Sequence, residues 1–502
     1  MHKYDIIFCS LPYSDLDHIY SAPAILKSVV MENGFTAKTI DFGQTLLLMC
    51  DKDIELFNRI QTYYITPGNI LTPDEIVILN KFYDYIIQFF KENPCKYIGL
   101  SIFSIYTHKP SAEITKLLRD NNIDSKIIVG GRGAKVPIFQ SIDILDPNLE
   151  EQYFGFGKLL LERKLVDHVV IGDGEDSILE ILFDKKASVV ENRSETFNYP
   201  LPNYDDYNFD DYLWAPGEAM FPITGSKGCV RSCDFCDIKF QFGRYRYRTG
   251  RDIANEMIYI AETFNFRKFQ FTDSLVNGGL KPFREFCTIV SEYNFANPEK
   301  KITWNGQYIS RLASEMPVDL YQIMADSGAH GLTIGAESGS NNVLTAMNKK
   351  TTVEALYSEL EQFRKHNITC LLLTFVGHWS ETYEDFVKHC EMFINIAPYV
   401  RSGTISALTL GNPAYLYPGT PAMDTSTAAG IVMSDFNREI IWINKNNASN
   451  TYKERLFRRL VLSKLISRLK IPIIDETTEF STASSIIELQ HKQINKFYND
   501  DK

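Results

Sequence analysis

Three cysteines lie close together near the middle of the chain, at Cys229, Cys233 and Cys236. Their spacing is C-x3-C-x2-C. Thiolates are the usual protein ligands of iron–sulfur clusters, and a 4Fe–4S cluster generally takes four of them. A cluster held by these three alone would keep one iron without a protein ligand, and that iron could bind a small molecule. The spacing therefore indicates a cluster that takes part in chemistry as well as in electron transfer.

Two other interpretations of the three cysteines stay open. A zinc site takes four ligands, commonly in two close pairs, but the nearest later cysteine is Cys287 and the next histidine is His330. Three structural cysteines would not require this spacing. Disulfides are not expected, because the nine cysteines are an odd number in 502 residues and no apolar leader opens the chain. These features predict a reducing compartment and a cytoplasmic protein.

Phe235 stands directly before the last of the three cysteines. With this aromatic residue, Cys229, Cys233 and Cys236 match the signature of radical S-adenosylmethionine (radical SAM) enzymes, and the chain resembles this family. The resemblance implies a 4Fe–4S cluster whose open iron binds the amino and carboxylate groups of S-adenosylmethionine. One electron from a reductant such as flavodoxin or ferredoxin would then cleave the sulfonium and yield a 5′-deoxyadenosyl radical. It also implies that Phe235 packs near the adenine.

The length of the chain predicts two or three domains. The expected divisions are a first domain over 1–186, a linker over 187–218, a catalytic domain over 219–415 and a helical region over 416–502. The net charge of −11 argues against nucleic acid as a partner. No apolar run reaches the roughly 18 residues that a membrane span requires.

Short apolar runs alternate with helical patterns in the first domain, from residues 4–10 to residues 166–175. Five such runs predict a doubly wound α/β domain with a parallel sheet, and residues 44–95 are expected to be a helical elaboration. Ligands bind such sheets at the carboxyl ends of the strands. The candidate residues there are Ser101, Ser104, Gly130, Gly131, Gly172, Gly174 and Glu175.

The segments GLSIFS, KIIVGG and VDHVVIGDGE resemble the cobalamin-binding domain that precedes many radical SAM enzymes, the class B methyltransferase-like members. The resemblance implies that the first domain binds cobalamin or descends from a domain that did. Many cobalamin proteins carry D-x-H-x-x-G in the first strand–helix loop. Here the loop Asp15–Ser21 contains His18 without that motif, so His18 is expected to be a loop residue and no ligand of cobalt.

The catalytic domain shows six strand-like runs separated by helices, which predicts a (β/α)6 partial barrel. Its strands are expected at 222–226, 268–273, 302–307, 331–337, 370–377 and 403–410. Active sites of such barrels lie at the carboxyl ends of the strands. Candidates there for contacts with S-adenosylmethionine or substrate are Asp273, Ser274, Glu337 and Gly377. The plainer interpretation of Asp273 and Glu337 is the capping of the following helix.

Residues 453–470 form a basic helical pattern in the last region. An anionic substrate, a nucleic acid or a membrane surface could bind such a helix. The acidic chain favours the simpler expectation, a helix that caps the barrel and turns a solvated basic face outward.

The function predicted from all these features is radical methyl transfer to an unactivated carbon, or to phosphorus, with cobalamin as second cofactor. One alternative is a radical SAM enzyme without cobalamin that carries out rearrangement, oxidation or cyclisation. Another is an iron–sulfur or zinc protein that only binds. The substrate class stays open among peptide, natural product, lipid and nucleoside.

Overall fold

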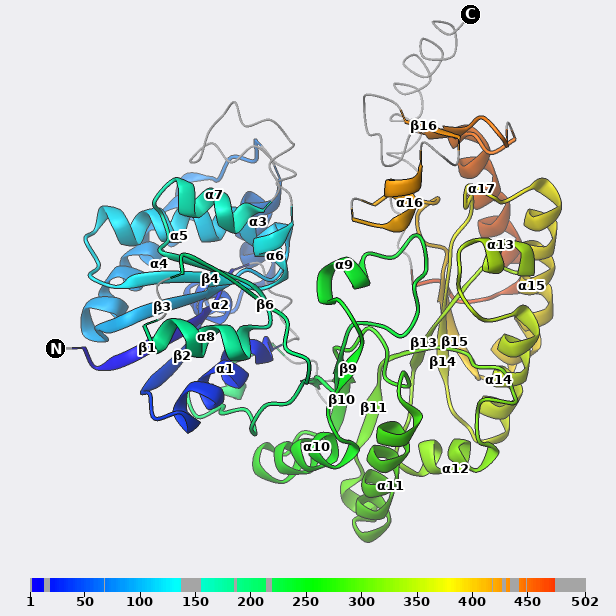
Figure 1. Ribbon diagram of the computed structural model, residues 1–502, viewed down its shortest axis with the longest axis horizontal. Coiled ribbons are helices and arrows are strands. Elements are labelled where there is room, and N and C mark those ends of the chain that lie inside the picture. Colours follow the sequence, from blue (N-terminus) through cyan, green and yellow to red (C-terminus); the bar gives the residue numbers. More distant parts are fainter. Residues whose placement is uncertain are drawn as a thin grey trace, which may run out of the picture. The chain divides into compact units, whose positions relative to one another are not determined.

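The computed structural model describes residues 2–12, 19–66, 68–136, 155–184, 187–213, 219–417, 419–426, 430–433, 442–447 and 449–474. The chain divides into two compact units, Met1–Pro222 and Ile223–Lys502 (Figure 1). The loop around His18 and the residues after 474 lie outside the described residues.

A parallel six-stranded sheet forms the centre of the first unit, with the order β2-β1-β3-β4-β5-β6. Its strands are β1 (Tyr4–Ser10), β2 (Ala37–Asp41), β3 (Cys95–Ser101), β4 (Lys126–Gly130), β5 (His168–Gly172) and β6 (Val189–Asn192). The predicted doubly wound sheet is confirmed. The sixth strand differs from expectation, because β6 lies in the segment predicted to be a linker. It is four residues long and pairs with β5 in parallel, so no periodicity could reveal it.

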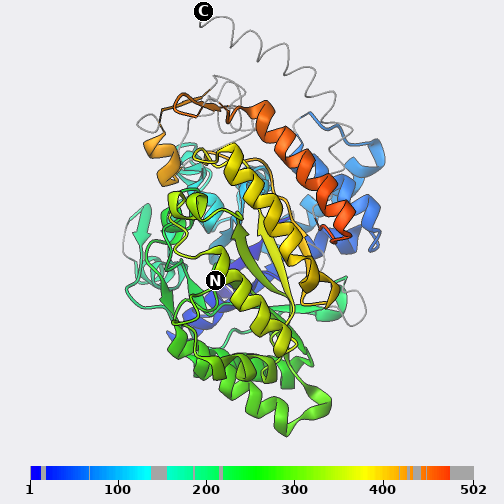
Figure 2. The same ribbon diagram turned by 90° about the vertical axis from the view of Figure 1, so that its right-hand side faces the viewer.

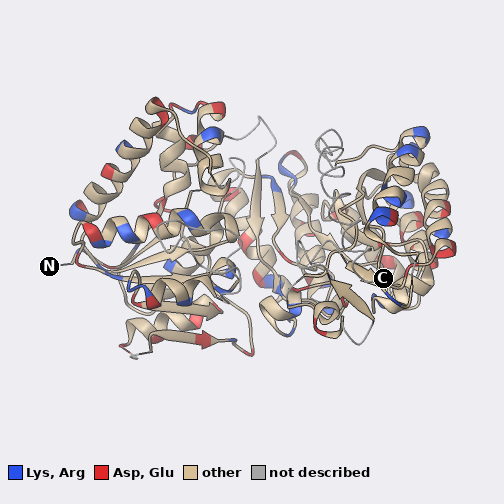
Figure 3. Ribbon diagram, turned by 90° about the horizontal axis from the view of Figure 1, so that it is seen from above, with Lys and Arg blue, Asp and Glu red and all other residues tan. Residues whose placement is uncertain are grey.

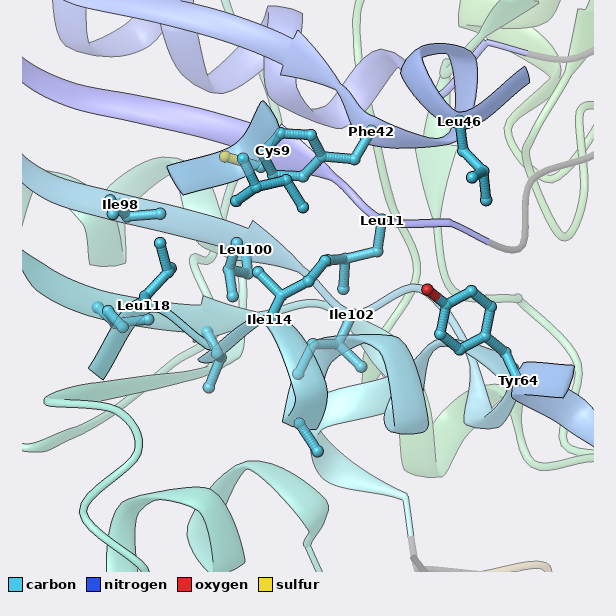
Figure 4. Packing of buried hydrophobic residues seen from close by; sticks show 14 of the residues in the cluster. Cys9, Leu11, Phe42, Leu46, Tyr64, Ile98, Leu100, Ile102, Ile114 and Leu118 are labelled. Carbon is cyan, nitrogen blue, oxygen red and sulfur yellow. The ribbon is translucent and has the colours of Figure 1, made fainter. Parts of the chain in front are cut away.

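Helices cover both faces of this sheet because successive strand residues point to opposite sides. Ile6 and Phe8 pack on the side of α1 (Ser21–Glu32) and α8 (Gly174–Leu182). Ile7 and Cys9 face the larger core, whose packing Figure 4 shows. That core is completed by α2 (Phe42–Met49), α3 (Ile54–Ile65), α4 (Pro73–Glu92), α5 (His108–Asp120) and α7 (Phe156–Glu162).

The helices α2, α3 and α4 make up the predicted helical elaboration, and polar caps fix where they begin. Asp41 accepts from two backbone N–H groups at the start of α2, and Asp53 accepts from one at the start of α3. Thr72 and Glu75 form a reciprocal capping box at the start of α4. Phe42 and Phe82 are fully buried, so these helices serve packing of the first unit.

The segment after β6 returns to the sheet through Asp206. Its carboxylate lies 2.6 Å from Lys27 Nζ and 2.9 Å from Lys38 Nζ, and it accepts from Thr39 N at 2.9 Å. Burial alone would raise the pKa of Asp206, but the bonds from the two ammonium groups outweigh it and hold that pKa below its ordinary value. This part of the expected linker therefore belongs to the first unit.

The second unit holds a partial barrel of parallel strands, as predicted. One sheet has the order β11-β10-β7 and the other β12-β13-β14-β15. The strands are β7 (Met220–Ile223), β10 (Lys268–Phe271), β11 (Thr303–Asn305), β12 (Gln307–Tyr308), β13 (Leu332–Glu337), β14 (Cys370–Thr374) and β15 (Ile405–Thr409). Gly306 alone separates β11 from β12. A Cβ there would come within 2.6 Å of Val276 and 2.9 Å of Phe271, so only glycine fits at this junction.

Helices follow the barrel strands and lie outside them (Figure 1). They are α10 (Gly250–Phe264), α11 (Leu280–Ala296), α12 (Val318–Asp326), α13 (Asn341–Ala346), α14 (Val353–Lys365) and α15 (Tyr383–Arg401). The chain then forms α16 (Pro421–Thr425), an antiparallel pair of β16 (Ile431–Met433) and β17 (Trp442–Asn444), and α17 (Tyr452–Leu469). Figure 2 shows α17 in orange-red beside α15 in yellow.

The expectation of a solvated basic face on α17 holds for Lys453, Lys464 and Arg468, which are exposed, and fails for three arginines. Arg455 and Arg458 are completely buried, and Arg459 is 8% exposed. Arg458 pairs with the carboxylates of Glu381 and Glu454. Arg455 donates to the backbone carbonyls of Asn450 and Trp442, and Arg459 donates to that of Gly411. Elsewhere acidic and basic residues alternate along the helices of both units (Figure 3). Among the described residues, no helix combines the length and the apolar character that crossing a bilayer requires.

Candidate functional site

The three cysteines lie on a loop that leaves and re-enters a short antiparallel ribbon. The loop runs from β8 (Ser226–Lys227) through α9 (Ile238–Phe242) to β9 (Arg246–Tyr247), which pairs with β8. Gly228 precedes the first cysteine with φ of +84°, and a Cβ there would lie 2.9 Å from the carbonyl oxygen of Arg244. Glycine therefore lets the two ends of the loop approach closely.

Asp273 anchors the start of this loop. One carboxylate oxygen accepts from Gly225 N at 2.7 Å and the other from Ser226 Oγ at 2.6 Å. Burial raises the pKa of Asp273 to about 7, although these hydrogen bonds oppose the rise. The predicted role of Asp273 was contact with a ligand, whereas both oxygens here bind the chain that leads to the cysteines. Ser274 follows directly and is half-buried.

The environment of the cysteines is unfavourable to bare thiolates. Cys233 is 9% exposed, and Cys229 and Cys236 are half-buried. Burial raises the pKa of Cys233 to about 12, against the attraction of the Lys349 ammonium, and burial also raises the pKa of Cys236. Thiols in such a place ionise when a metal cation takes the proton's position. The loop carries three thiols, one fewer than a closed zinc site takes and the number that leaves one iron of a 4Fe–4S cluster open. Among the described residues, no three metal-ligating side chains converge closely enough to hold a metal ion.

Lys349 and Glu337 form an ion pair beside the cysteines. Burial alone would lower the pKa of Lys349, but Glu337 and the thiol groups of Cys233 and Cys236 hold it above its ordinary value. Glu337 ends β13 with φ of +59°, at a shift in the pairing of β13 with β14. A left-handed backbone is uncommon outside glycine and often marks functional sites. The pair can thus offer one acceptor and one cation to a zwitterionic ligand.

Phe235 connects the cysteine loop with the loop after β14. Its ring contacts Phe375 edge to face, with centroids 5.2 Å apart, and Lys349 Nζ lies 5.8 Å from its centroid. Gly377 follows two residues after Phe375 with φ of +83°. The structure therefore brings Phe235, Glu337 and Lys349 close to the three cysteines. Asp273 binds the start of the cysteine loop, and Gly377 lies against Arg455 of α17.

Two buried polar atoms of the cysteine loop, Arg231 Nη2 and Asp234 Oδ1, have no hydrogen-bond partner among the described residues. Buried polar groups almost always have partners. Their place next to the cysteines fits a loop that closes around polar groups supplied by a cofactor.

The candidate residues of the first unit meet at the carboxyl edge of its sheet. Ser101 is level with Ser10 of β1 and with Gly130 of β4. Ser104 Oγ accepts from Tyr106 N, at 3.3 Å, and so shapes the turn after β3. On that turn the Phe103 side chain is 55% exposed.

The predicted glycines of this edge serve its own backbone. A Cβ on Gly131 would lie 2.7 Å from the carbonyl oxygen of Ile102, and one on Gly172 would lie 2.0 Å from that of Asn192. Gly174 and Glu175 begin α8, where a Cβ on Gly174 would contact Leu26 at 3.3 Å. Packing at the sheet edge therefore explains why Gly131, Gly172 and Gly174 are glycines.

The chain combines a parallel α/β unit with a partial barrel, and three cysteines lie on the loop after the first barrel strand. Residues 223–393 match the family model of the radical SAM superfamily. The predicted radical SAM enzyme is thereby confirmed, and with it the 4Fe–4S cluster and S-adenosylmethionine that define the superfamily.

Sequence relatives are distant. The chain is 22% identical over 303 residues to cytidylyl-2-hydroxyethylphosphonate methyltransferase of Streptomyces wedmorensis, covering 53% of this chain and 54% of that protein. It is 22% identical over 281 residues to anaerobic magnesium-protoporphyrin IX monomethyl ester cyclase of a Synechocystis strain, covering 50% and 54%. The chain thus spans about half the length of these two curated relatives.

Solved structures match the fold over more of the chain. The radical S-adenosylmethionine methyltransferase TsrM from Kitasatospora setae, solved with cobalamin and a [4Fe-4S] cluster, matches with a TM-score of 0.60 and 13% identity over 95% of this chain and 92% of that one. The cobalamin-dependent S-adenosylmethionine radical enzyme OxsB matches with a TM-score of 0.59 and 14% identity over 87% and 64%. At these identities, the fold is what the likeness shows.

Sequence reasoning missed Lys349 and the arginines of α17. Lys349 is 12 residues from Glu337 in the chain, and two adjacent lysines gave no sign of which one is inside. Arg455, Arg458 and Arg459 have i, i+3 and i+4 spacing, which places them on one face of a helix. That face could have been assigned to the interior only by knowing the carboxylate opposite.

Proposed function

We propose that this enzyme transfers a methyl group to an unactivated carbon or to phosphorus, with a 4Fe–4S cluster, S-adenosylmethionine and cobalamin. The observation that carries the proposal is the joining of a three-cysteine loop to an upstream parallel α/β unit in one chain. The same two-part fold binds both cobalamin and a [4Fe-4S] cluster in TsrM.

In this proposal Cys229, Cys233 and Cys236 hold the cluster, which when bound supplies the electron that cleaves S-adenosylmethionine to a 5′-deoxyadenosyl radical. Glu337 would accept from an N–H of the methionyl amino group, and Lys349 would attract the methionyl carboxylate. Asp273 holds the cysteine loop in place through Gly225 N and Ser226 Oγ.

The corrinoid is assigned to the carboxyl edge of the first unit, where Ser101 and Gly130 end neighbouring strands. Ser104 and Phe103 on the adjacent turn offer a hydroxyl and an exposed apolar ring. A macrocycle with polar side chains needs both kinds of surface.

The remaining assignments follow from the chemistry. A low-potential protein such as flavodoxin or ferredoxin would supply the electron, and the substrate could be a peptide, natural product, lipid or nucleoside. All nine cysteines lie in described residues and none forms a disulfide, which agrees with the cytoplasmic location we propose.

Anaerobic reconstitution tests the first part. We expect about four irons and four sulfides per chain, and production of 5′-deoxyadenosine when S-adenosylmethionine and a reductant are added. Cys233→Ala should abolish the bound iron and the product, whereas Cys390→Ala, at a half-buried cysteine on α15, should leave both unchanged. Zinc without iron, or unchanged iron in Cys233→Ala, would contradict the proposal.

Purification in the presence of hydroxocobalamin tests the second part. Retention of the corrinoid, seen in its absorption spectrum, is the expected result. A radical SAM enzyme without cobalamin is the second candidate, and the glycines of the first unit favour it. The backbones of Ile102 and Asn192 fill the space beside Gly131 and Gly172. They therefore leave little room for a ligand next to these two glycines. If the reconstituted protein formed 5′-deoxyadenosine from S-adenosylmethionine but retained no corrinoid, the second candidate would be favoured.

A further inference from the structure

The loop between β14 and α15, residues 375–382, is held on one side by the C-terminal segment, which we define as β17, α17 and the residues between them. Asn450 Nδ2 donates to the carbonyl oxygen of His378 at 2.6 Å, Asn444 Nδ2 donates to that of Trp379 at 2.9 Å, and Asn447 Nδ2 donates to that of Glu381 at 2.9 Å. Three carbonyls of a short loop thus have partners from residues near β17 and the start of α17. Such a set of hydrogen bonds fixes the path of the loop backbone.

An ion pair completes this attachment. Arg458 Nη1 of α17 lies 2.7 Å from Glu381 Oε1, and the Arg458 and Glu381 side chains are at most 1% exposed. The same Glu381 oxygen accepts from Gly377 N at 3.1 Å. Burial raises the pKa of Glu381, opposed by Arg458. The arginine therefore stabilises the carboxylate that holds the N–H of the loop glycine.

Arg455 closes the back of the same loop. Its guanidinium lies 3.6 Å from the Trp442 ring centroid, and a Cβ on Gly377 would come within 2.2 Å of its side chain. Gly377 thus packs directly against the Arg455 side chain of α17, which leaves no room for the loop to move toward the helix.

On its other side the loop meets the cysteine loop through one side chain. His378 is 1% exposed, and its Nε2 lies 3.2 Å from Oδ2 of Asp234, the residue between Cys233 and Phe235. The other ring nitrogen contacts Ser380 Oγ at 2.7 Å. His378 therefore has a fixed orientation between the C-terminal segment and the cysteines.

We propose that His378 is a positioning residue for the cluster loop, and that the buried Arg458–Glu381 pair of α17 holds it in place. The contacts run from Arg458 to Glu381, through the loop backbone to His378, and from there to Asp234. The proposal rests on the proposed function only in that Cys233 and Cys236, on either side of Asp234 and Phe235, are cluster ligands. Holding reacting groups to within about 1 Å matters greatly for rate, since small misplacements cost up to about 100-fold.

Two substitutions of His378 test the contact with Asp234. His378→Phe keeps a ring of similar size and removes the polar contact, while His378→Gln keeps a side-chain N–H donor. We expect both proteins to bind about four irons per chain. In His378→Phe the electron paramagnetic resonance spectrum of the reduced cluster with S-adenosylmethionine should differ from wild type, and 5′-deoxyadenosine formation should fall about tenfold or more. In His378→Gln, the spectrum and the rate of 5′-deoxyadenosine formation should both be close to wild type.

The ion pair is tested by an exchange that avoids an isolated buried charge. Arg458→Met together with Glu381→Leu replaces the pair by apolar side chains, which proteins often tolerate, but removes the acceptor for Gly377 N. We expect the same spectral change and the same loss of rate as in His378→Phe. Arg364→Met, which removes an exposed ion pair with Glu361, is the matched control and should change neither.

Wild-type spectra and rates in both His378→Phe and the double variant would overturn the inference. Iron loss in His378→Phe and His378→Gln alike would also overturn it, because the residue would then serve loop folding regardless of its polar contact. Failure of the wild-type enzyme to form 5′-deoxyadenosine would count against the proposed function instead, and the spectrum of the reduced cluster would still decide about His378.

Discussion

Lys349 is a half-buried residue on which the proposed contact with S-adenosylmethionine depends. Its ammonium is compensated by Glu337 and lies near two cluster cysteines. In Lys349→Gln the Glu337 carboxylate loses its charged partner. Hydrogen bonds to charged groups contribute about 1.5–3 kcal/mol, so the KM for S-adenosylmethionine should rise about 10- to 100-fold. Lys350→Gln, at the exposed neighbour, should leave it unchanged, and equal effects of the two substitutions would argue against this site.

His389 gives the second unit a defined sensitivity to acid. The ring is fully buried on α15, stacks on Phe393 with centroids 5.3 Å apart, and has no hydrogen-bond partner among the described residues. Burial lowers the pKa of His389 to about 3. The unfolded chain binds a proton near pH 6.5 and the folded chain does not, so stability is fully present above that pH and decreases as pH falls toward 3.

His389→Phe should remove this part of the pH dependence. At pH 5 the histidine costs about 2 kcal/mol relative to pH 8, and the phenylalanine keeps the ring contact without buried polar nitrogens. Denaturant unfolding at pH 5 and pH 8 measures the difference. The control is His366→Phe, at a half-buried histidine. A wild-type difference between the two pH values in His389→Phe would show that other groups are responsible.

Only some of the individual residues of the candidate site could be predicted from the sequence. The three cysteines and Phe235 are recognisable because their spacing in sequence is itself the chemical signal. Asp234, His378 and Lys349 depend on distant partners: 144 residues separate His378 from Asp234, and nothing local marks such a contact.

At the level of elements, Asp206 decides where the first unit ends. It compensates Lys27, which is 4% exposed, and fixes the returning chain to β2. Asp206→Asn leaves that ammonium buried without a counter-charge, and breaking a buried pair costs about 3–5 kcal/mol. Chemical denaturation should show a loss of this size. Asp205→Asn, at the exposed neighbour, should change stability by less than about 0.5 kcal/mol, and equal losses would contradict the assignment.

Elements with a continuous apolar run were predictable. β1 and β13 carry enough buried side chains to be recognised from the sequence alone. β6 was missed because its four residues are held by pairing with β5 and not by their own pattern. The orientation of α17 was misjudged for a related reason: arginine usually lies in solvent, and Arg458 is inside only because Glu381 is there to meet it.

For the whole molecule, the two units have separate cores, so we expect two thermal transitions. A ligand that binds only the folded form stabilises the unit that binds it. Removal of the cluster by Cys233→Ala should therefore lower one transition by several degrees and leave the other unchanged. Differential scanning calorimetry under anaerobic conditions measures both. A single transition that shifts as a whole would show that the units unfold together.

The attachment of the β14–α15 loop to the C-terminal segment also sets an order of events during biosynthesis. The carbonyls of His378, Trp379 and Glu381 receive their donors from Asn450, Asn444 and Asn447, and the Glu381 carboxylate receives its cation from Arg458. The ribosome makes these partners more than 60 residues after the loop, as the separations of 65 to 77 residues show. The loop that carries His378 can therefore complete these contacts only after the chain through Arg458 has emerged from the ribosome. A chain whose synthesis stops before α17 would lack the donors and the cation that hold His378 against Asp234, and its cysteine loop would be less well positioned.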